Sequence, residues 1–168
     1  RLQVSHSRRV GGRHQVDLGI DASRRRVVAA DRLLGERLSD AMLEGYAQDA
    51  ITAGPLLVTM AARYTHNSRW GNALTPSVGV ALEPSGTLRL RMGAARGFRG
   101  PSFKELGWRF LNAAAGYTVE GNDALVPESS WQLFTGATWA PSRALRVDAD
   151  LYRNNLREMI DLVLVGST

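Results

Sequence analysis

Leu145-Arg146-Val147-Asp148-Ala149-Asp150-Leu151 places apolar side chains at the odd positions and charged side chains at the even ones. A period of two means that successive side chains point to opposite faces of a sheet, so the pattern predicts a β-strand. The same alternation recurs in Leu88-Arg89-Leu90-Arg91-Met92 and in Val16-Asp17-Leu18-Gly19-Ile20. The sequence therefore predicts an all-β fold.

Turn residues divide the chain into about eight strands. We expect these near residues 1–9, 14–29, 42–53, 56–66, 76–83, 87–97, 130–140 and 144–164. Helical turns are expected only near Ser102 to Asn112 and Ala30 to Asp40. Short connections alternate with longer ones at about 30–41, 67–75 and 98–130, which predicts an antiparallel up-and-down meander with tight turns at one rim and loops at the other.

Composition excludes several classes of function. The 168 residues contain no cysteine, which rules out disulfides and thiolate chemistry within this sequence. The net charge of +5 comes from dispersed arginines without a nucleic-acid recognition motif, so no nucleic-acid partner is expected. His6, His14 and His66 lack metal-ligand spacing, and no catalytic motif is present. We predict neither an enzyme nor a bound cofactor or metal.

Alternation alone leaves two architectures open. A soluble sandwich would point Leu88, Leu90 and Met92 into a core, whereas a membrane barrel would point them into lipid and its arginines into the lumen. Several expected strands are about ten residues long, as a tilted membrane strand requires. Arg89, Arg91, Arg146, Asp148 and Asp150 would then share the face opposite to Leu145, Val147 and Leu151.

Two segments carry a resemblance to a known family. They are Gly97-Phe98-Arg99-Gly100-Pro101-Ser102-Phe103-Lys104-Glu105-Leu106 and Glu120-Gly121-Asn122-Asp123-Ala124-Leu125-Val126-Pro127-Glu128-Ser129. They resemble the GFRAPS-like and GNPxLxPE-like segments of TonB-dependent outer-membrane receptors. Their structural residues are expected to be Gly97, Phe98, Pro101, Gly121, Asn122, Pro127 and Glu128.

These motif residues also have a physical reading. Gly97 and Pro101 suit a sharp exit from a strand, and Gly121-Asn122 predicts a turn with positive φ. Pro127 suits the entry into the next strand, and Glu128 has Arg96 or Arg99 as its expected partner.

The resemblance implies that residues 1–168 are part of a transmembrane β-barrel in the bacterial outer membrane, an incomplete barrel without its plug domain. It also implies uptake of a scarce ligand such as ferric siderophore, haem or cobalamin. Partners would be membrane lipid, the ligand, and a TonB-type energy-coupling protein that acts through the plug. The expected ligand contacts lie in the longest connection, where aromatic and cationic side chains mix. They are Arg99, Lys104, Trp108, Arg109 and Tyr117.

Two other functions compete with transport. One is a receptor-derived β-segment with a structural role in a larger membrane assembly, and the other is a soluble β-sandwich binding module. The full reading frame separates the first from a transporter, and dependence on detergent separates the second. We expect the isolated chain to be unstable as a soluble monomer, because a meander of about eight strands leaves two edges unpaired.

Overall fold

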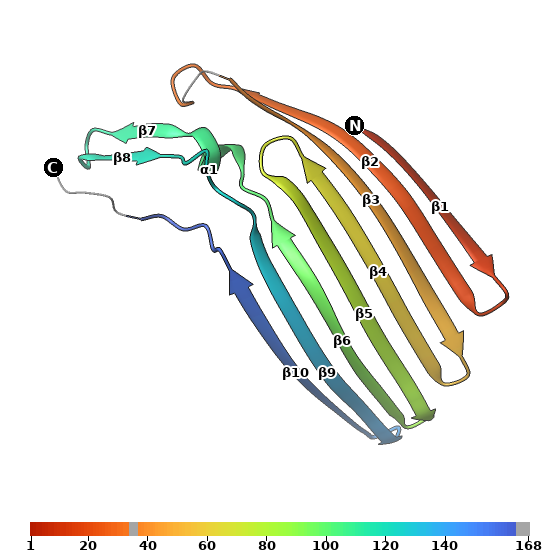
Figure 1. Ribbon diagram of the computed structural model, residues 1–168. Coiled ribbons are helices and arrows are strands. Elements are labelled where there is room, and N and C mark those ends of the chain that lie inside the picture. The colour runs from red at the N-terminus through yellow and green to blue at the C-terminus, as the bar shows by residue number, and fades with distance from the viewer. Residues whose placement is uncertain (34–36, 164–168) are drawn as a thin grey trace.

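The computed structural model describes residues 1–33 and 37–163. Eight strands form one antiparallel sheet in the order β1-β2-β3-β4-β5-β6-β9-β10, so each strand pairs with its neighbours along the meander (Figure 1). The strands are β1 (Leu2–Val10), β2 (His14–Val28), β3 (Arg37–Ala53), β4 (Leu56–Asn67), β5 (Gly71–Ser85), β6 (Leu88–Arg99), β9 (Glu128–Ser142) and β10 (Leu145–Arg157). The predicted meander is confirmed.

Strand bounds differ from the prediction at the loop end of the sheet. β3 begins at Arg37, which lies opposite Val28 of β2, so pairing extends further than the alternation indicated. The helical turn expected over Ala30 to Asp40 is wrong for residues 37–40, which belong to β3, whereas at residues 30–33 the chain makes one turn in which the Arg32 and Leu33 backbones donate to the Ala29 carbonyl. Residues 34–36 lie outside the described residues. β5 begins at Gly71, which leaves only residues 68–70 between β4 and β5. Both differences arise because hydrogen-bond pairing continues where the apolar pattern fades.

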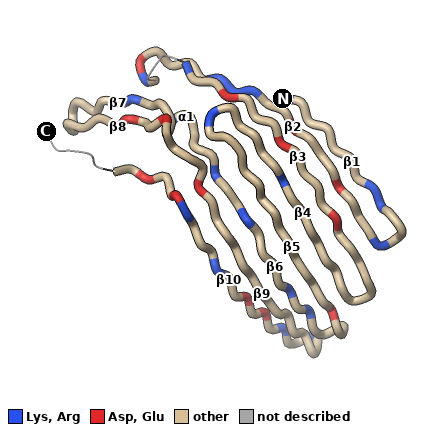
Figure 2. Tube along the Cα trace, viewed as in Figure 1, with Lys and Arg blue, Asp and Glu red and all other residues tan. Residues whose placement is uncertain are grey.

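Most of the charged side chains lie on one face of the sheet, here called the inner face. Arg91 and Asp150 flank Gly136 in register and form an ion pair of 2.9 Å. Asp148 accepts hydrogen bonds from Arg146 and from the Thr138 hydroxyl, at 2.8 and 2.6 Å. Figure 2 shows these opposite charges gathered at the lower ends of β6, β9 and β10. Cross-strand pairing of this kind holds the charges together along the sheet.

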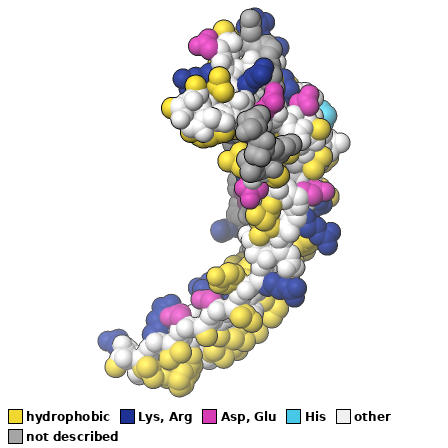
Figure 3. Space-filling model, turned by 90° about the vertical axis from the view of Figure 1, so that its left-hand side faces the viewer, with side chains coloured by type: hydrophobic (Ala, Val, Ile, Leu, Met, Phe, Trp, Pro, Cys, Tyr) yellow, Lys and Arg dark blue, Asp and Glu magenta, His cyan; other side chains and the backbone are white. Residues whose placement is uncertain are grey.

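The other face, here called the outer face, carries apolar side chains that no other part of the described residues covers. Met92 and Leu151 lie on either side of Thr135 in register, and their side chains are 56% and 71% exposed. Figure 3 shows a continuous belt of hydrophobic side chains along the convex side of the lower sheet, with charged groups on the concave side. Such a surface needs a partner or lipid to cover it.

Buried apolar residues lie instead at the loop end. Leu33, Leu38 and Leu106 are almost fully buried. Leu106 belongs to the short helix α1 (Phe103–Gly107), Leu38 lies next to Gly107 of this helix, and Leu33 bridges to Trp108 at its end. The helix precedes the hairpin formed by β7 (Arg109–Asn112) and β8 (Tyr117–Glu120). None of the helices in the described residues is long and apolar enough to cross a membrane.

Candidate functional site

The connection between β6 and β9 begins with a capped helix. Ser102 is the N-cap of α1, and its hydroxyl accepts a hydrogen bond from the Glu105 backbone at 3.3 Å. The Glu105 carboxylate in turn accepts from the Ser102 backbone at 2.7 Å. This reciprocal capping box satisfies two backbone N–H groups that a helix of five residues would otherwise leave to solvent.

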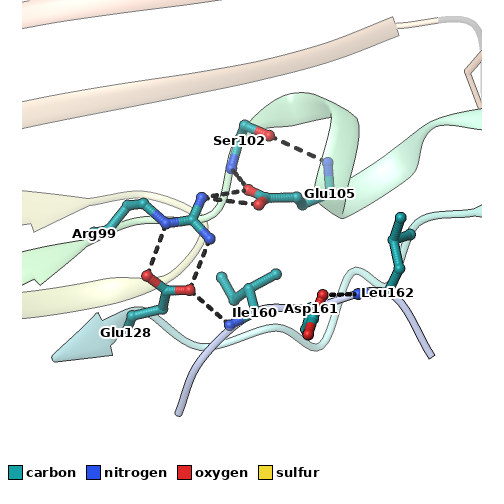
Figure 4. A network of polar contacts seen from close by, with 7 residues as sticks. All are labelled: Arg99, Ser102, Glu105, Glu128, Ile160, Asp161 and Leu162. Carbon is teal, nitrogen blue, oxygen red and sulfur yellow. Dashed lines mark hydrogen bonds and ion pairs between the residues drawn. The ribbon is translucent and has the colours of Figure 1, made fainter. Parts of the chain in front are cut away.

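Arg99 ties this helix to the first residue of β9. Its guanidinium donates to both oxygens of Glu128 at 2.8 Å and to Glu105 at 2.8 Å (Figure 4). Glu128 also accepts from the Ile160 backbone at 2.6 Å, which fixes the chain that follows β10. Arg99 and Glu128 are opposite each other in register, so the sheet itself places the pair. Of the two partners expected for Glu128, the structure selects Arg99.

The charge network also sets the protonation of Glu105. Burial raises the pKa of Glu105, but hydrogen bonds from the Ser102 backbone and from Arg99 outweigh burial and hold the pKa below its ordinary value. Glu105 is therefore ionised at neutral pH, and its charge keeps Arg99 occupied.

Gly121 and Asn122 hold the far end of the connection against α1. The Gly121 backbone donates to the Trp108 carbonyl and the Asn122 backbone to the Glu105 carbonyl, both at 2.8 Å. A Cβ at Gly121 would lie 2.7 Å from the Gly107 backbone nitrogen, so a glycine is needed for close approach. Among the described residues, neither Gly121 nor Asn122 has a positive φ. The positive-φ turn expected at these two residues is therefore wrong.

The base of the connection packs on the loop between β2 and β3. Trp108 forms an isolated antiparallel bridge with Leu33, and the Arg109 backbone donates to the Arg32 carbonyl at 2.8 Å. A Cβ on Gly107 would meet the Leu38 side chain at 2.7 Å. The connection is thus seated on the rim, while the β7–β8 hairpin extends beyond it (Figure 1).

The five residues expected to bind ligand do not form one cluster. Arg99 is held by two carboxylates. Lys104 lies over the Trp108 ring at 5.4 Å. Arg109 pairs with Glu120 at one end of the hairpin, and Tyr117 pairs with Asn112 at the other end. Alternation places Arg109 and Tyr117 on opposite faces of that hairpin.

The remaining motif residues lie along the exit from β6 and the entry to β9. Phe98 packs on Trp70 with ring centroids 5.4 Å apart, and a Cβ at Gly100 would meet the same indole at 2.8 Å. A Cβ at Gly97 would lie 2.9 Å from the Ser130 hydroxyl. Pro101 is buried, and Pro127 directly precedes β9.

A second polar network escaped the sequence analysis. The buried carboxylate of Asp40 is paired with Arg25 and accepts from the Asn67 amide at 3.0 Å, which joins three neighbouring strands. Arg25 also lies 5.4 Å from the centre of the Phe103 ring, so this network reaches α1. The arginine run at 24–26 was visible in the sequence, but nothing local indicated that Asn67 would meet Asp40. His66 is the penultimate residue of β4, and its ring pairs with the Asn72 side chain.

Comparison with known proteins identifies the family of this chain. A model of the family described as "TonB dependent receptor-like, beta-barrel" matches residues 3–168. No curated protein sequence matches the chain.

Solved structures of siderophore receptors share the fold. The siderophore receptor PirA from Pseudomonas aeruginosa is similar with a TM-score of 0.82 at 15% identity, over 92% of this chain and 31% of that one. A double mutant of the ferric enterobactin receptor PfeA from the same organism gives 0.76 at 19% identity, over 92% and 26%. PirA from Acinetobacter baumannii gives 0.73 at 14% identity, over 92% and 26%. This chain spans less than a third of each of these receptors, and by its family match it belongs to the TonB-dependent receptor β-barrel family.

Proposed function

We propose that the chain forms part of the barrel of an outer-membrane receptor that takes up a scarce ligand of the ferric siderophore class. The observation that carries this proposal is the family match over residues 3–168. The ligand class is suggested by the siderophore receptors of similar fold. Transport itself would need a plug domain and a TonB-type coupling protein in addition to the barrel.

The two faces of the sheet fit this role. The outer face would contact lipid, and Trp131 and Trp139 near the two ends of β9 would sit at the membrane interfaces. The inner face would line the lumen with paired charges such as Arg91 and Asp150. Since the tight turns of membrane barrels face the periplasm, the β7–β8 hairpin would face the outside.

Ligand contacts are proposed on the exposed side chains of the β7–β8 hairpin rather than on the charge network around α1. Arg99 is occupied by Glu105 and Glu128, and Trp108 bridges to Leu33, so both have structural partners. Arg109 and Tyr117 are exposed on opposite faces and at opposite ends of the hairpin, so they would contact different parts of an anionic ligand with aromatic groups.

The experiment uses the complete receptor and a panel of ferric siderophores, haem and cobalamin. Arg109→Ala with Tyr117→Ala should reduce binding of one member of this panel, with the barrel still assembled as judged by heat-modifiable electrophoretic mobility. Arg13→Ala with Arg143→Ala is the control, since both residues lie in turns at the opposite rim. Unchanged affinity for whichever compound the parent binds would leave the hairpin without a ligand role, and no binding of any compound would overturn the ligand class.

A further inference from the structure

Two connections at the loop end of the sheet meet at one carboxylate. Glu128 is the first residue of β9, and its side chain is only 15% exposed. Its Oε1 atom accepts one hydrogen bond from the Arg99 guanidinium, at 2.8 Å, and another from the Ile160 backbone, at 2.6 Å (Figure 4). Arg99 is the last residue of β6, whereas Ile160 lies beyond the end of β10. The same oxygen therefore joins two parts of the rim that are far apart in the sequence.

The three nitrogen atoms of the Arg99 guanidinium are divided between two carboxylates. Nε and Nη2 form a fork on the two oxygens of Glu128, both at 2.8 Å. Nη1 donates to both oxygens of Glu105 in α1, at 2.8 and 3.0 Å. A guanidinium can serve both partners because its donors lie in one plane, whereas the ammonium group of a lysine is a point charge. Arg99 thus fixes α1 relative to the start of β9.

Glu105 continues these contacts into the β7–β8 hairpin. Its backbone carbonyl accepts a hydrogen bond from the Asn122 backbone at 2.8 Å, two residues beyond the end of β8. The neighbouring Gly121 approaches so closely that a Cβ there would lie 2.8 Å from the same carbonyl oxygen. A continuous path of hydrogen bonds therefore runs from the hairpin through the two carboxylates and Arg99 to the chain after β10. Contiguous networks of this kind can carry energetic coupling between separate parts of a protein.

The chain after β10 bends at Glu158, just before it reaches this path. Glu158 has a φ of 57° and is the only non-glycine residue with a positive φ in the described part of the chain. This conformation crowds the Cβ of an L-amino acid, and it persists only where the surroundings determine it. Two residues later, the Ile160 backbone donates to Glu128. This hydrogen bond therefore helps to hold the bend, and the bend depends on where the Glu128 carboxylate is placed.

We infer that Arg99 is a positioning residue that couples the β7–β8 hairpin to residues 158–163. A ligand that shifts the hairpin and α1 also moves the Arg99 guanidinium, and through Glu128 it moves the Ile160 backbone. By reciprocity, any contact that orders residues 158–163 favours the docked hairpin. The two connections therefore respond to ligand as one surface. The inference rests on the proposed ligand role of the hairpin, but the coupling itself is a property of the protein without ligand.

Hydrogen exchange of the complete receptor in detergent, without ligand, tests this coupling. Arg99→Gln removes the central link but leaves the Glu128 carboxylate and the Ile160 amide in place. Exchange should rise roughly three- to tenfold both in α1 and in residues 158–163, which lies between the effect of an exposed ion pair and that of a shielded hydrogen bond to a charged group. Arg99→Lys keeps the charge without the fork and should give intermediate rates in both segments. Arg91→Gln is the matched control, because it breaks an arginine–aspartate pair elsewhere on the inner face and should leave both segments unchanged.

A double-mutant cycle separates coupling from a local effect. Gly121→Ala should raise exchange in residues 158–163, although the atoms nearest to its added Cβ all belong to α1. In the Arg99→Gln background the same substitution should leave these residues unchanged.

Parental exchange of residues 158–163 in the Arg99→Gln protein would overturn the coupling, as would an equal effect of Gly121→Ala with and without Arg99. Parental exchange in β4 and β5 shows that the barrel is assembled, and the cycle is run with Arg99→Lys if the glutamine variant does not assemble. Ligand uptake is not measured, so a wrong ligand class would leave this result unaffected.

Discussion

Gly121→Ala should release the β7–β8 hairpin from α1. The added Cβ would lie 2.7 Å from the Gly107 nitrogen, 2.8 Å from the Glu105 carbonyl oxygen and 2.8 Å from the carbonyl carbon of Leu106. All three atoms belong to backbone, so a rotamer change cannot relieve the overlap. An ordinary contact begins at 3.4 Å, so the two segments must separate by about 0.6 to 0.7 Å.

The cost has two sources. Overpacking of a well-fitted contact costs roughly 1–3 kcal/mol. The separation also weakens the hydrogen bonds from the Gly121 and Asn122 backbones to Trp108 and Glu105, each worth roughly 0.5–1.5 kcal/mol. Docking of the hairpin should therefore lose roughly 2–5 kcal/mol. If opening and closing are fast relative to cleavage, proteolysis in this segment should accelerate by at least about 30-fold.

Limited trypsin digestion of the complete receptor measures this effect. Lys104 and Arg109 provide cleavage sites within the segment, and Arg143 in the β9–β10 turn provides an internal reference rate. Gly86→Ala is the matched control, because a Cβ there meets nothing within 4 Å and its φ is not positive. Cleavage of the Gly121→Ala protein at the parental rate would refute the close-approach argument.

Three further predictions address the helix cap, the outer face and the contact between loops. The pKa of Glu105 is lowered in the folded protein, so the carboxylate stabilises the helix cap fully above pH 4.5, the ordinary pKa of a glutamate, and this stabilisation is lost as the pH falls through the lowered pKa. Hydrogen exchange at the α1 amides should show this loss, and Glu105→Gln should abolish the pH dependence. Met92→Arg should cost about 2–4 kcal/mol if it lies near the bilayer midplane, whereas Arg91→Lys on the inner face should cost little; equal barrel assembly of both variants would contradict the assigned faces. Leu33→Cys with Trp108→Cys should form a disulfide under mild oxidation, since directly bridged residues lie within disulfide range and the chain has no other cysteine; failure to cross-link would contradict the loop contact.

Alternation was sufficient to predict the meander but not the full length of its strands. β1, β2, β4 and β6 follow the expected ranges to within a few residues, because each alternates along most of its length. β3 and β5 extend further at the loop end, where Arg37 and Gly71 pair with neighbouring strands without an apolar pattern of their own. Pairing there depends on the neighbouring strand, and a periodicity within one segment contains no information about it.

The ligand site stays a prediction, and the structure adds one constraint on it that the sequence could not supply. Arg99, among aromatic residues in a long connection, has the composition expected of a ligand contact. The register opposes it to Glu128, and the capping box brings Glu105 to the same guanidinium, so two carboxylates already neutralise it. Composition identifies a cation near aromatics, but only the fold reveals whether its charge is already compensated.

The distribution of charge also decides between the two architectures that alternation left open. A soluble sandwich would need a second layer over Met60, Met92 and Leu151, and this layer would have to wrap around the convex side of the sheet. The five-residue helix α1 lies instead at the loop end, over Leu38. A solvated face would also leave its charges mostly dispersed, whereas Arg91, Arg99 and Arg146 are each paired with a carboxylate on the concave side. Paired charges inside the curve and uncovered apolar groups outside it are the arrangement that a barrel wall in lipid requires, because water is available only on its inner side.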